Sequence, residues 1–546
     1  MEKRTLLAVV LSAAVFIIYY GFFYTPPPPV KSPVIATAAT SPSATPGVLG
    51  TAPAVASPSG SMAVIPPVNN TPEVRNSLDS SVVQAQISSH TGLPAEWQLK
   101  KYFIKPDNKG PNINLLQDIV GSLPMGLLLF PGQAPVQPNY TLAQPAGNAL
   151  NYQAQVGDIA LQEKLEFLPT EYTLQISLVL ENRGTNPAAL SPGLRLEVEQ
   201  SPPSQKGFLI FKEAPNFKFP VYRVGTGVKR QHNVQKLGAF QEEVGEISWA
   251  GLEDHYFLRM MLARNVSAQN RVAYGNNGNA VFTQLQYGPE SLAPGQKREY
   301  QFTLYFGPKD PALLKKFGEA QLDKAVDYGW FGFIALPILT VLKLFYSFLH
   351  NWGLAIIALT LLIKLLLHPL TRKSMQSMKA MQTLQPQLQK LREKYADDRE
   401  QLNLQTMDLF KTHKVNPMGG CLPMLIQMPI YIALYKVLYN ATDLYHAPFF
   451  AFYHDLSAPD PYYVLPILLG IFMVLQQKMT PSTADPAQAK MMMIMPVMFS
   501  LFMIFLPLGL VLYIFVNTSL TVLQQWMNQR DLTFSDLFRG GKKSTA

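Results

Sequence analysis

An apolar run interrupted by a single lysine constrains this chain more than any other feature. The run from Gly353 to Leu367 reads GLAIIALTLLIKLLL, and its one charge is Lys364. Segment 353–370 is long and apolar enough to cross a bilayer as a helix. A charge near the middle of such a helix costs about 2.5 to 3.5 kcal/mol, so it usually faces a partner or a water-filled cavity. The alternative is that Lys364 snorkels, since it lies about two turns from the basic pair Arg372 and Lys373.

Further apolar runs predict a membrane protein with six transmembrane helices. Of the 546 residues 48% are hydrophobic and 15% charged, and the apolar runs lie at 6–24 and beyond about residue 330. We expect residues 1–24 to form an uncleaved anchor, because the run ends in aromatic residues that suit a membrane interface and lacks a small-residue cleavage site. The other five spans are expected at 353–370, 420–439, 463–478, 490–506 and 508–526.

Loop charge gives the expected orientation. Loop 371–414 carries nine Lys or Arg against five acids, whereas loop 440–461 has no Lys or Arg and three Asp. Basic loops stay in the cytoplasm, and with the basic N-terminus also inside, six spans satisfy this rule and seven do not. The apolar segment 331–349 is therefore expected to lie along the outer interface, within a region 317–350. The net charge of +9 is concentrated in inner loops, which argues against a nucleic-acid surface.

Between the first span and this interfacial region we expect a linker and an all-β domain. Residues 25–74 are rich in Pro, Ala, Ser and Thr, which is typical of a disordered linker. In residues 75–316 several short segments alternate apolar and polar side chains, for example around Leu174 to Leu180 and Tyr300 to Phe306. A period of two indicates half-buried strands, and a sandwich is favoured over a closed barrel.

The basic loop 371–414 has its own pattern. Four apolar positions are spaced four, three and four residues apart, and a second amphipathic stretch follows an Asp pair. This spacing predicts an antiparallel helical hairpin in the cytoplasm, although its basic residues could equally form an ordinary solvated face. The spaced positions are Leu384, Leu388, Leu391 and Tyr395 in the first arm, with Leu402, Met407 and Phe410 in the second. The five-helix core is assigned to 351–530, and residues 531–546 form a basic tail.

The sequence contains none of the common catalytic or metal-binding motifs. We find no signature of nucleotide hydrolysis, zinc proteolysis or an elbow-type nucleophile, and no His/Cys cluster with metal-ligand spacing. A single cysteine, Cys421, rules out an internal disulfide. We therefore expect no catalytic residues, no metal and no cofactor, and a protein that is not an enzyme.

The remaining functional signal in the sequence is a set of polar residues inside the expected membrane helices. Polar residues in three of the expected helices fall at positions that share a helix face, and the stripe on the last helix continues to Thr521. Such stripes favour a hydrophilic groove, although hydrogen bonding that merely joins helices is the alternative. The five later spans contain no acidic residue, which argues against an ion-coupled transporter. The candidate groove residues are Lys364, Thr360, Gln427, Tyr513 and Asn517.

Three longer segments resemble the YidC family of membrane-protein insertases. They read NPMGGCLPMLIQMPIYIALY at 416–435, DPYYVLPILLG at 460–470 and MPVMFSLFMIFLPLGLVLY at 495–513. VDYGWFGFIALP at 326–337 and HPLTRKSMQSM at 368–378 are similar to it too, so the likeness covers about 317–530. The first helix and the outer β domain match the Gram-negative branch in architecture.

The resemblance implies a five-helix insertase core with a groove open to the cytoplasm and to lipid. The family's conserved basic residue falls on Lys364, where most bacterial relatives have arginine, and Ile514 stands where relatives often have a second tyrosine. It further implies a multi-pass protein of the bacterial inner membrane with both termini cytoplasmic and the β domain periplasmic.

The function implied is that of an insertase and chaperone, which transfers nascent transmembrane segments into lipid without ATP hydrolysis. Its expected partners are nascent membrane proteins, the lipid bilayer, the Sec translocon, and the ribosome through the hairpin and the basic tail. A solute transporter and a structural scaffold for the outer domain are the alternatives.

Overall fold

The computed structural model describes most of the chain from the β domain to the last helix. The described residues are 72–530 except 107–109, 118–122, 147–148, 169–170, 201–206, 209–210, 213–217, 279, 396–397, 414, 416–421, 451 and 481–485. The predicted anchor at 1–24, nearly all of the linker, the tail at 531–546 and Cys421 lie outside these residues.

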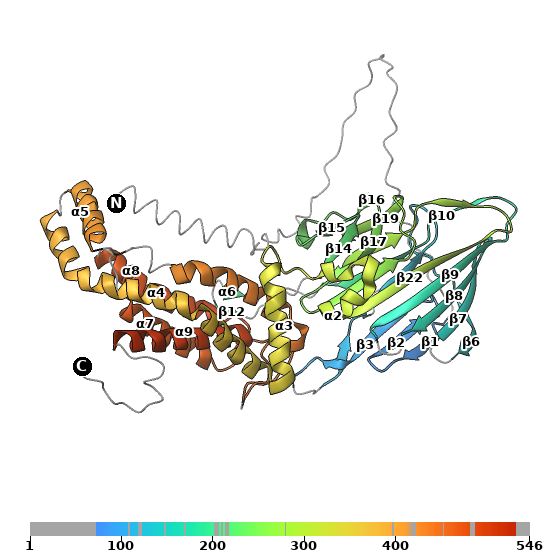
Figure 1. Ribbon diagram of the computed structural model, residues 1–546. Coiled ribbons are helices and arrows are strands. Elements are labelled where there is room, and N and C mark those ends of the chain that lie inside the picture. The colour runs from blue at the N-terminus through green and yellow to red at the C-terminus, as the bar shows by residue number, and fades with distance from the viewer. Residues whose placement is uncertain are drawn as a thin grey trace, which may run out of the picture. The chain divides into compact units, whose positions relative to one another are not determined.

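Antiparallel sheets build the first part of the described chain (Figure 1). The largest has nine strands, in the order β15 (Gly227–Arg230), β14 (Phe219–Val224), β17 (Ile247–Glu253), β18 (Phe257–Ala263), β22 (Lys297–Pro308), β9 (Thr173–Asn182), β8 (Ile159–Phe167), β7 (Ala149–Val156) and β6 (Thr141–Ala146). A five-stranded sheet has the order β16 (Gln241–Gly245), β19 (Asn270–Asn276), β20 (Ala280–Gln286), β11 (Gly193–Glu199) and β5 (Met125–Leu128).

Smaller sheets complete this domain. Four strands follow in sequence order, β1 (Arg75–Asp79), β2 (Val83–Ser88), β3 (Pro94–Phe103) and β4 (Asn112–Asn114). Two pairs are β10 (Ala188–Leu190) with β21 (Glu290–Leu292), and β12 (Gly207–Phe208) with β13 (Phe211–Lys212). One 3-10 turn, η1 (Val234–Lys236), precedes β16.

The core of the domain lies between the sheets, and the prediction of a β-rich domain is confirmed. The nine- and five-stranded sheets pack together where β17 contacts β20. β9 shows the predicted alternation, but every residue of β17, β18 and β20 is buried, so these strands are covered on both faces. Trp97 of β3 joins the four-stranded sheet to the largest one, since its indole nitrogen donates to the Phe306 carbonyl at 2.8 Å.

Helical segments make up the rest of the described chain. Short turns α2 (Pro311–Leu314), η2 (Lys315–Ala320) and η3 (Leu322–Ala325) follow β22. The longer helices are α3 (Gly332–Leu349), α4 (Trp352–Lys394), α5 (Arg399–Thr412), α6 (Leu422–Asn440), α7 (Val464–Met479), α8 (Pro486–Met503) and α9 (Leu508–Gln529), with a 3-10 turn η5 (Thr442–Leu444) after α6.

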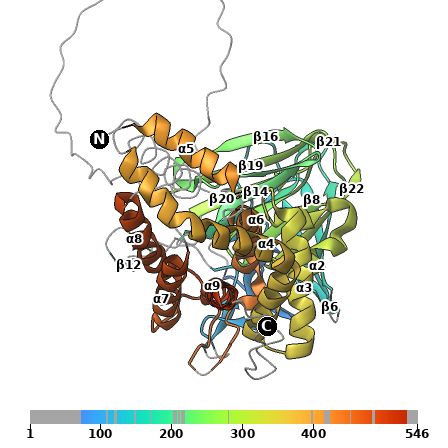
Figure 2. The ribbon, with the colours of Figure 1, turned by 60° about the vertical axis from the view of Figure 1, so that its left-hand side comes forward.

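Three of the described helices, α3, α4 and α9, are long and apolar enough to cross a membrane by length and composition. α7 and the Met492–Met503 part of α8 are shorter apolar helices that lie side by side (Figure 2). In the most apolar stretch of each long helix, the buried share is 61% for α9 but 22% for α3 and 28% for α4. α9 is therefore the most enclosed of the three, and α3 runs across the direction of α4 and α9 (Figure 1).

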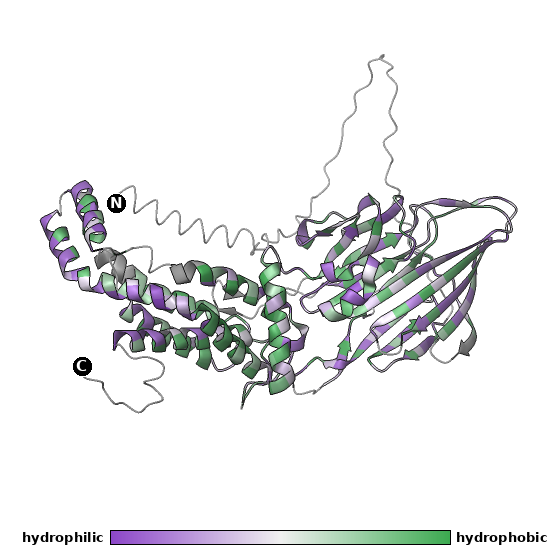
Figure 3. Cartoon of the chain, in the orientation of Figure 1, coloured by the Kyte–Doolittle hydropathy of each residue, from purple (hydrophilic) through white to green (hydrophobic). Residues whose placement is uncertain are grey.

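α4 extends beyond the predicted membrane span at 353–370 into the first arm of the predicted hairpin. It continues for 43 residues through Pro369 and Pro386, and its second half packs against α5. The contact between them is a small apolar cluster of Met381, Leu384, Leu388 and Phe410. Figure 3 shows that α5 and the far end of α4 are more hydrophilic than the helices around α9.

Candidate functional site

Polar side chains of α6 and α9 meet in two successive hydrogen-bonded pairs. Gln427 donates from its side-chain nitrogen to the Tyr513 hydroxyl at 3.0 Å. Four residues later in the sequence of each helix, Asn517 donates to the Tyr431 hydroxyl. The two tyrosine rings pack edge to face, with centroids 5.6 Å apart. Because 427 and 431, like 513 and 517, are four residues apart, each helix contributes one face to this polar ladder.

Lys364 extends the polar ladder from α6 and α9 to α4. Its ammonium donates to the Thr521 hydroxyl at 2.6 Å, and Thr521 in turn donates to the Asn517 carbonyl at 2.8 Å. Lys364 is partly buried, and none of the described carboxylates lies within ion-pair distance of it. A cation whose partner is a neutral hydroxyl keeps most of its attraction for a negative group.

Asn517 offers a second unused group. The residue is only 5% exposed, and its side-chain oxygen accepts no hydrogen bond from the described residues. A buried acceptor without a donor costs about 1 to 3 kcal/mol, so it favours binding of a group that carries an N–H or O–H. The ladder therefore presents both a cation and an acceptor among apolar helices.

Of the five residues proposed from the sequence, four lie in this ladder and one does not. Thr360 is 1% exposed, and its hydroxyl donates to the Ile356 carbonyl of its own helix at 2.7 Å. It packs in the helical core and presents no free donor to the ladder. Two ladder residues were absent from the proposed set, Tyr431 and Thr521. Thr521 is the continuation of the α9 stripe noted in the sequence, and Tyr431 follows Gln427 by the same four positions, a spacing that could have identified it.

The end of α6 away from the ladder is held by charged and aromatic side chains of other elements. On α3, the Lys343 ammonium lies 3.1 Å from an Asp310 oxygen and 3.0 Å from an Asp443 oxygen, just beyond α6. The buried Lys309 pairs with Glu253 at 2.6 Å and reaches the Asn440 side-chain oxygen at 3.5 Å. We call this set of contacts the outer joint.

His255 adds an uncharged contact to the outer joint. Its ring nitrogen lies 2.6 Å from the Tyr439 carbonyl, and its ring stacks on that of Tyr439 at 3.8 Å. Burial lowers the pKa of His255 to about 4, and the hydrogen bond to the carbonyl only partly offsets this effect. The imidazole is therefore neutral near pH 7 and donates its one N–H to α6.

A search of the described residues for three or more His, Cys, Asp or Glu side chains that could together hold a metal ion finds none.

Two family models match the chain in succession. Residues 75–341 match the YidC periplasmic domain, and residues 344–535 match the family described as 60Kd inner membrane protein. The boundary between the two matches falls within α3.

Individual proteins match over different shares of the chain. The membrane protein insertase YidC of Geotalea daltonii is 50% identical over 280 residues, which are 51% of this chain and 52% of that protein. The protein of the same name from Oleidesulfovibrio alaskensis is 35% identical over 473 residues, 82% of this chain and 85% of that protein. The chain spans about half the length of several other curated relatives that it matches, between 52% and 59%.

Among solved structures, a crystal structure of an active YidC insertase with its first transmembrane domain resolved covers 83% of this chain and 93% of that chain. Its TM-score is 0.37 at 18% identity, a similarity too low to support an argument about the site.

Proposed function

The chain belongs to the YidC family of membrane-protein insertases, and from this premise we propose that it transfers nascent transmembrane segments from the cytoplasm into the inner membrane along the polar ladder of α4, α6 and α9. The observation that carries the proposal is the contact of Lys364 with Thr521 in place of a carboxylate. A client that brings a negative or polar group meets a cation that has no counter-ion among the described residues.

The polar ladder is suited to transient binding of a client. Neutral hydrogen bonds between membrane helices are worth about 0.6 kcal/mol on average, so the pairs of α6 and α9 can open at little cost. A client polar group that replaces them keeps its own hydrogen bonds while it lies among apolar helices. The ladder thereby shortens the path over which that group has to cross hydrocarbon.

Release into lipid supplies the driving force. Burial of apolar surface is worth about 0.8 kcal/mol per CH₂ group, which for a whole transmembrane segment exceeds the cost of the lost ladder contacts. The membrane potential adds about 2.3 kcal/mol per charge and 100 mV for charged client segments. No nucleotide hydrolysis enters this mechanism, and the client is moved without chemical change.

The proposed arrangement in the membrane follows the charge pattern of the loops. It has six transmembrane helices, with the β domain in the periplasm and α3 along the outer interface. Both termini lie in the cytoplasm, together with the hairpin formed by the second half of α4 and α5. The crossing of α3 over α4 and α9 supports its interfacial position. We include as partners the bilayer, the Sec translocon, and the ribosome through the hairpin and the basic tail.

Reconstitution tests the function directly. The purified chain is placed in liposomes without ATP or other membrane proteins, translating ribosomes are added, and protease protection of a small two-span client is measured. We expect protection well above that in empty liposomes. Equal protection in both would overturn insertion by this chain alone, and repetition with purified Sec translocon would then show whether that partner is required.

A further inference from the structure

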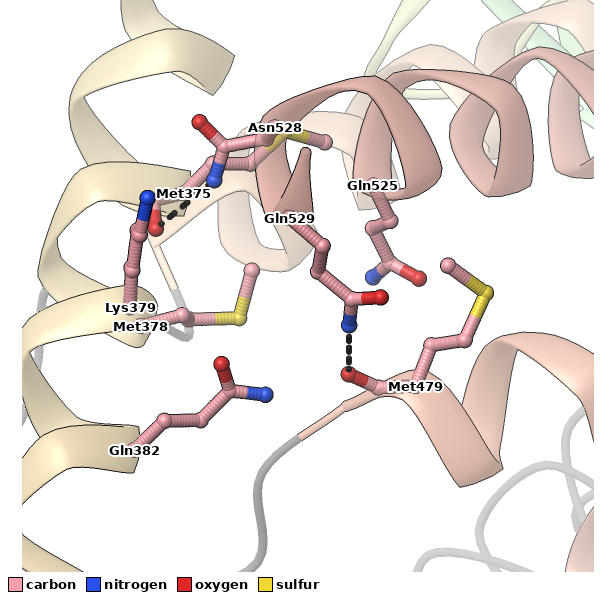
Figure 4. A pocket seen from close by; sticks show the side chains of 8 residues that line it. All are labelled: Met375, Met378, Lys379, Gln382, Met479, Gln525, Asn528 and Gln529. Atoms are coloured by element: carbon pink, nitrogen blue, oxygen red, sulfur yellow. Dashed lines mark hydrogen bonds between the residues drawn. The ribbon is translucent and has the colours of Figure 1, made fainter. Parts of the chain in front are cut away.

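A cavity of about 220 Å³ lies beyond the polar ladder, between the ends of α7 and α9 and the part of α4 that follows Lys364 (Figure 4). Met375, the first α4 residue of its wall, is eleven residues beyond Lys364, or about 16 Å along a helix. The wall contains three methionines, four carboxamides and one lysine: Met375, Met378, Lys379, Gln382, Met479, Gln525, Asn528 and Gln529. We call it the amide pocket.

The amide pocket continues the stripe of α9. Tyr513, Asn517 and Thr521 are followed at the same four-residue spacing by Gln525 and Gln529, both in the pocket wall. Residues four apart on a helix are neighbours about 40° apart around its axis, so the polar line winds around α9 by about 160° as it runs from Tyr513 in the ladder to Gln529 in the pocket. A segment that moves along this line would pass from one site to the other.

Gln525 has an unused acceptor in the pocket wall. It is 7% exposed, and its side-chain nitrogen donates to the Thr480 hydroxyl at 3.4 Å, but its oxygen accepts no hydrogen bond from the described residues. Asn528 and Gln529 use their amide nitrogens on the carbonyls of Met375 and Met479, at 3.4 and 3.2 Å. A ligand that carries an N–H or an O–H would satisfy this buried acceptor.

The composition of the rest of the wall suits a polypeptide ligand. Carboxamides both donate and accept, as a peptide backbone does, and methionine side chains adapt to many different side chains. A phosphate group would call for several cations, whereas the wall has only Lys379. A cavity of about 220 Å³ is too small to enclose a stretch of helix about 10 Å wide.

We propose that the amide pocket binds a short extended stretch of the client, the polar loop that flanks its transmembrane segment, before that loop moves along α9 to Lys364. This inference rests on the proposed insertase function, and it names the part of the client that binds first. The apolar part of the client is expected to bypass the pocket.

Disulfide cross-linking in the full-length protein tests the proposal. Cys421 is replaced by serine, and one cysteine is introduced by Met378→Cys in the pocket or by Gln376→Cys, an exposed control position on the same helix. Ribosome-bound clients carry one cysteine, either in the polar loop or in the middle of the apolar segment. We expect Met378→Cys to capture the loop at least about five times more often than Gln376→Cys does, and to capture the apolar segment no better than the control.

Equal capture at both positions, in a sample where the client still becomes protease-protected, would overturn the pocket and leave the insertase function standing. Preferential capture of the apolar segment at Met378→Cys would overturn the assignment to polar loops. Loss of both capture and protection in every variant would contradict the proposed function itself.

A matched pair of glutamines tests the acceptor. Gln524 and Gln525 are neighbours whose side-chain oxygens both lack a described donor, but only Gln525 lines the pocket. In the Met378→Cys protein, Gln525→Met should lower loop capture about five-fold, the effect of one lost hydrogen bond, while Gln524→Met should not. The same fall in both variants would show a structural effect on α9 and overturn the role of Gln525.

Discussion

At the scale of single residues, Lys364 could either attract a client or only reach toward lipid headgroups. Its hydrogen bond to the Thr521 hydroxyl favours the first role. A snorkelling lysine would be replaceable by any residue that its helix tolerates, because its charge would only reach toward headgroups. A lysine that attracts clients has to keep its charge at this depth, and its contact with Thr521 places the ammonium against α9.

We predict that Lys364→Ala lowers insertion of clients with acidic outer segments about ten-fold, since a hydrogen bond to a charged group is worth about 1.5 to 3 kcal/mol. Lys364→Arg should retain insertion, because it keeps the charge. Protease protection in proteoliposomes measures both, with the exposed Lys373→Ala on the same helix as control. Normal insertion of every client by Lys364→Ala would refute the role of the cation.

Glu163 in β8 is a buried carboxyl whose charge state links the stability of the β domain to pH. It is 2% exposed, and burial raises its pKa to about 8, an effect that Tyr140 only partly offsets. Gly92 lies over it at φ +71°, and a Cβ there would come within 2.3 Å of a carboxylate oxygen. In the unfolded chain the pKa is near 4.5, so between pH 4.5 and 8 the native state binds the extra proton.

The β domain is therefore expected to lose stability as pH rises through this window, by up to about 1.4 kcal/mol per pH unit from this one group. Glu163→Gln should remove that slope and raise the free energy of unfolding at pH 7. Urea unfolding of the purified chain at pH 5, 6, 7 and 8, followed by the fluorescence of the buried Trp97 and Trp249, measures it. An unchanged slope in the variant would place the pH dependence elsewhere.

At the scale of elements, the pairs between α6 and α9 either join two helices or form the path of a client. Tyr431→Phe removes the acceptor for Asn517 and leaves a ring of nearly the same size. If the pairs only join the helices, the free energy of unfolding falls by about 0.6 kcal/mol and insertion is unchanged. We predict a stability change of the same small size together with an altered rate of insertion, so insertion kinetics decide between the two and unfolding in detergent serves as the control for a larger structural defect.

The sequence predicted elements best where a period could be read along one helix or strand. The stripe from Tyr513 to Asn517 and the alternation in β9 were both visible in this way. Tyr431 was missed because a tyrosine in an apolar helix looks like an interface residue until its partner on α9 is known. The sequence pattern did not show that the span at 353–370 and the first hairpin arm form one continuous helix, whose second half is stabilised by packing of Leu384 and Leu388 against Phe410.

At the scale of the whole molecule, the β domain and the hairpin are expected to contribute unequally. The hairpin is a continuation of α4, the helix that carries Lys364, whereas the contacts of the β domain with α6 described above lie at the outer joint. We therefore expect the hairpin, near the start of the client's path, to matter more for insertion than the β domain at the far end of that path.

We predict that removal of 371–414 lowers insertion at least about ten-fold, while removal of most of 75–300 leaves at least half of it. Protease protection of the same client in proteoliposomes gives the ranking, with equal amounts of reconstituted protein as control. A smaller defect from loss of the hairpin than from loss of the domain would reverse the assignment of roles.

The outer joint also has a consequence for the order in which the molecule assembles during synthesis. The last strand of the β domain ends at Pro308, and α6 ends at Asn440, about 130 residues later. At about 5 to 20 residues per second, about 7 to 26 seconds separate the emergence of the two partners. The surface around His255 and Lys309 therefore has time to fold before α6 is synthesised. We expect the folded β domain to provide the surface against which α6 then docks.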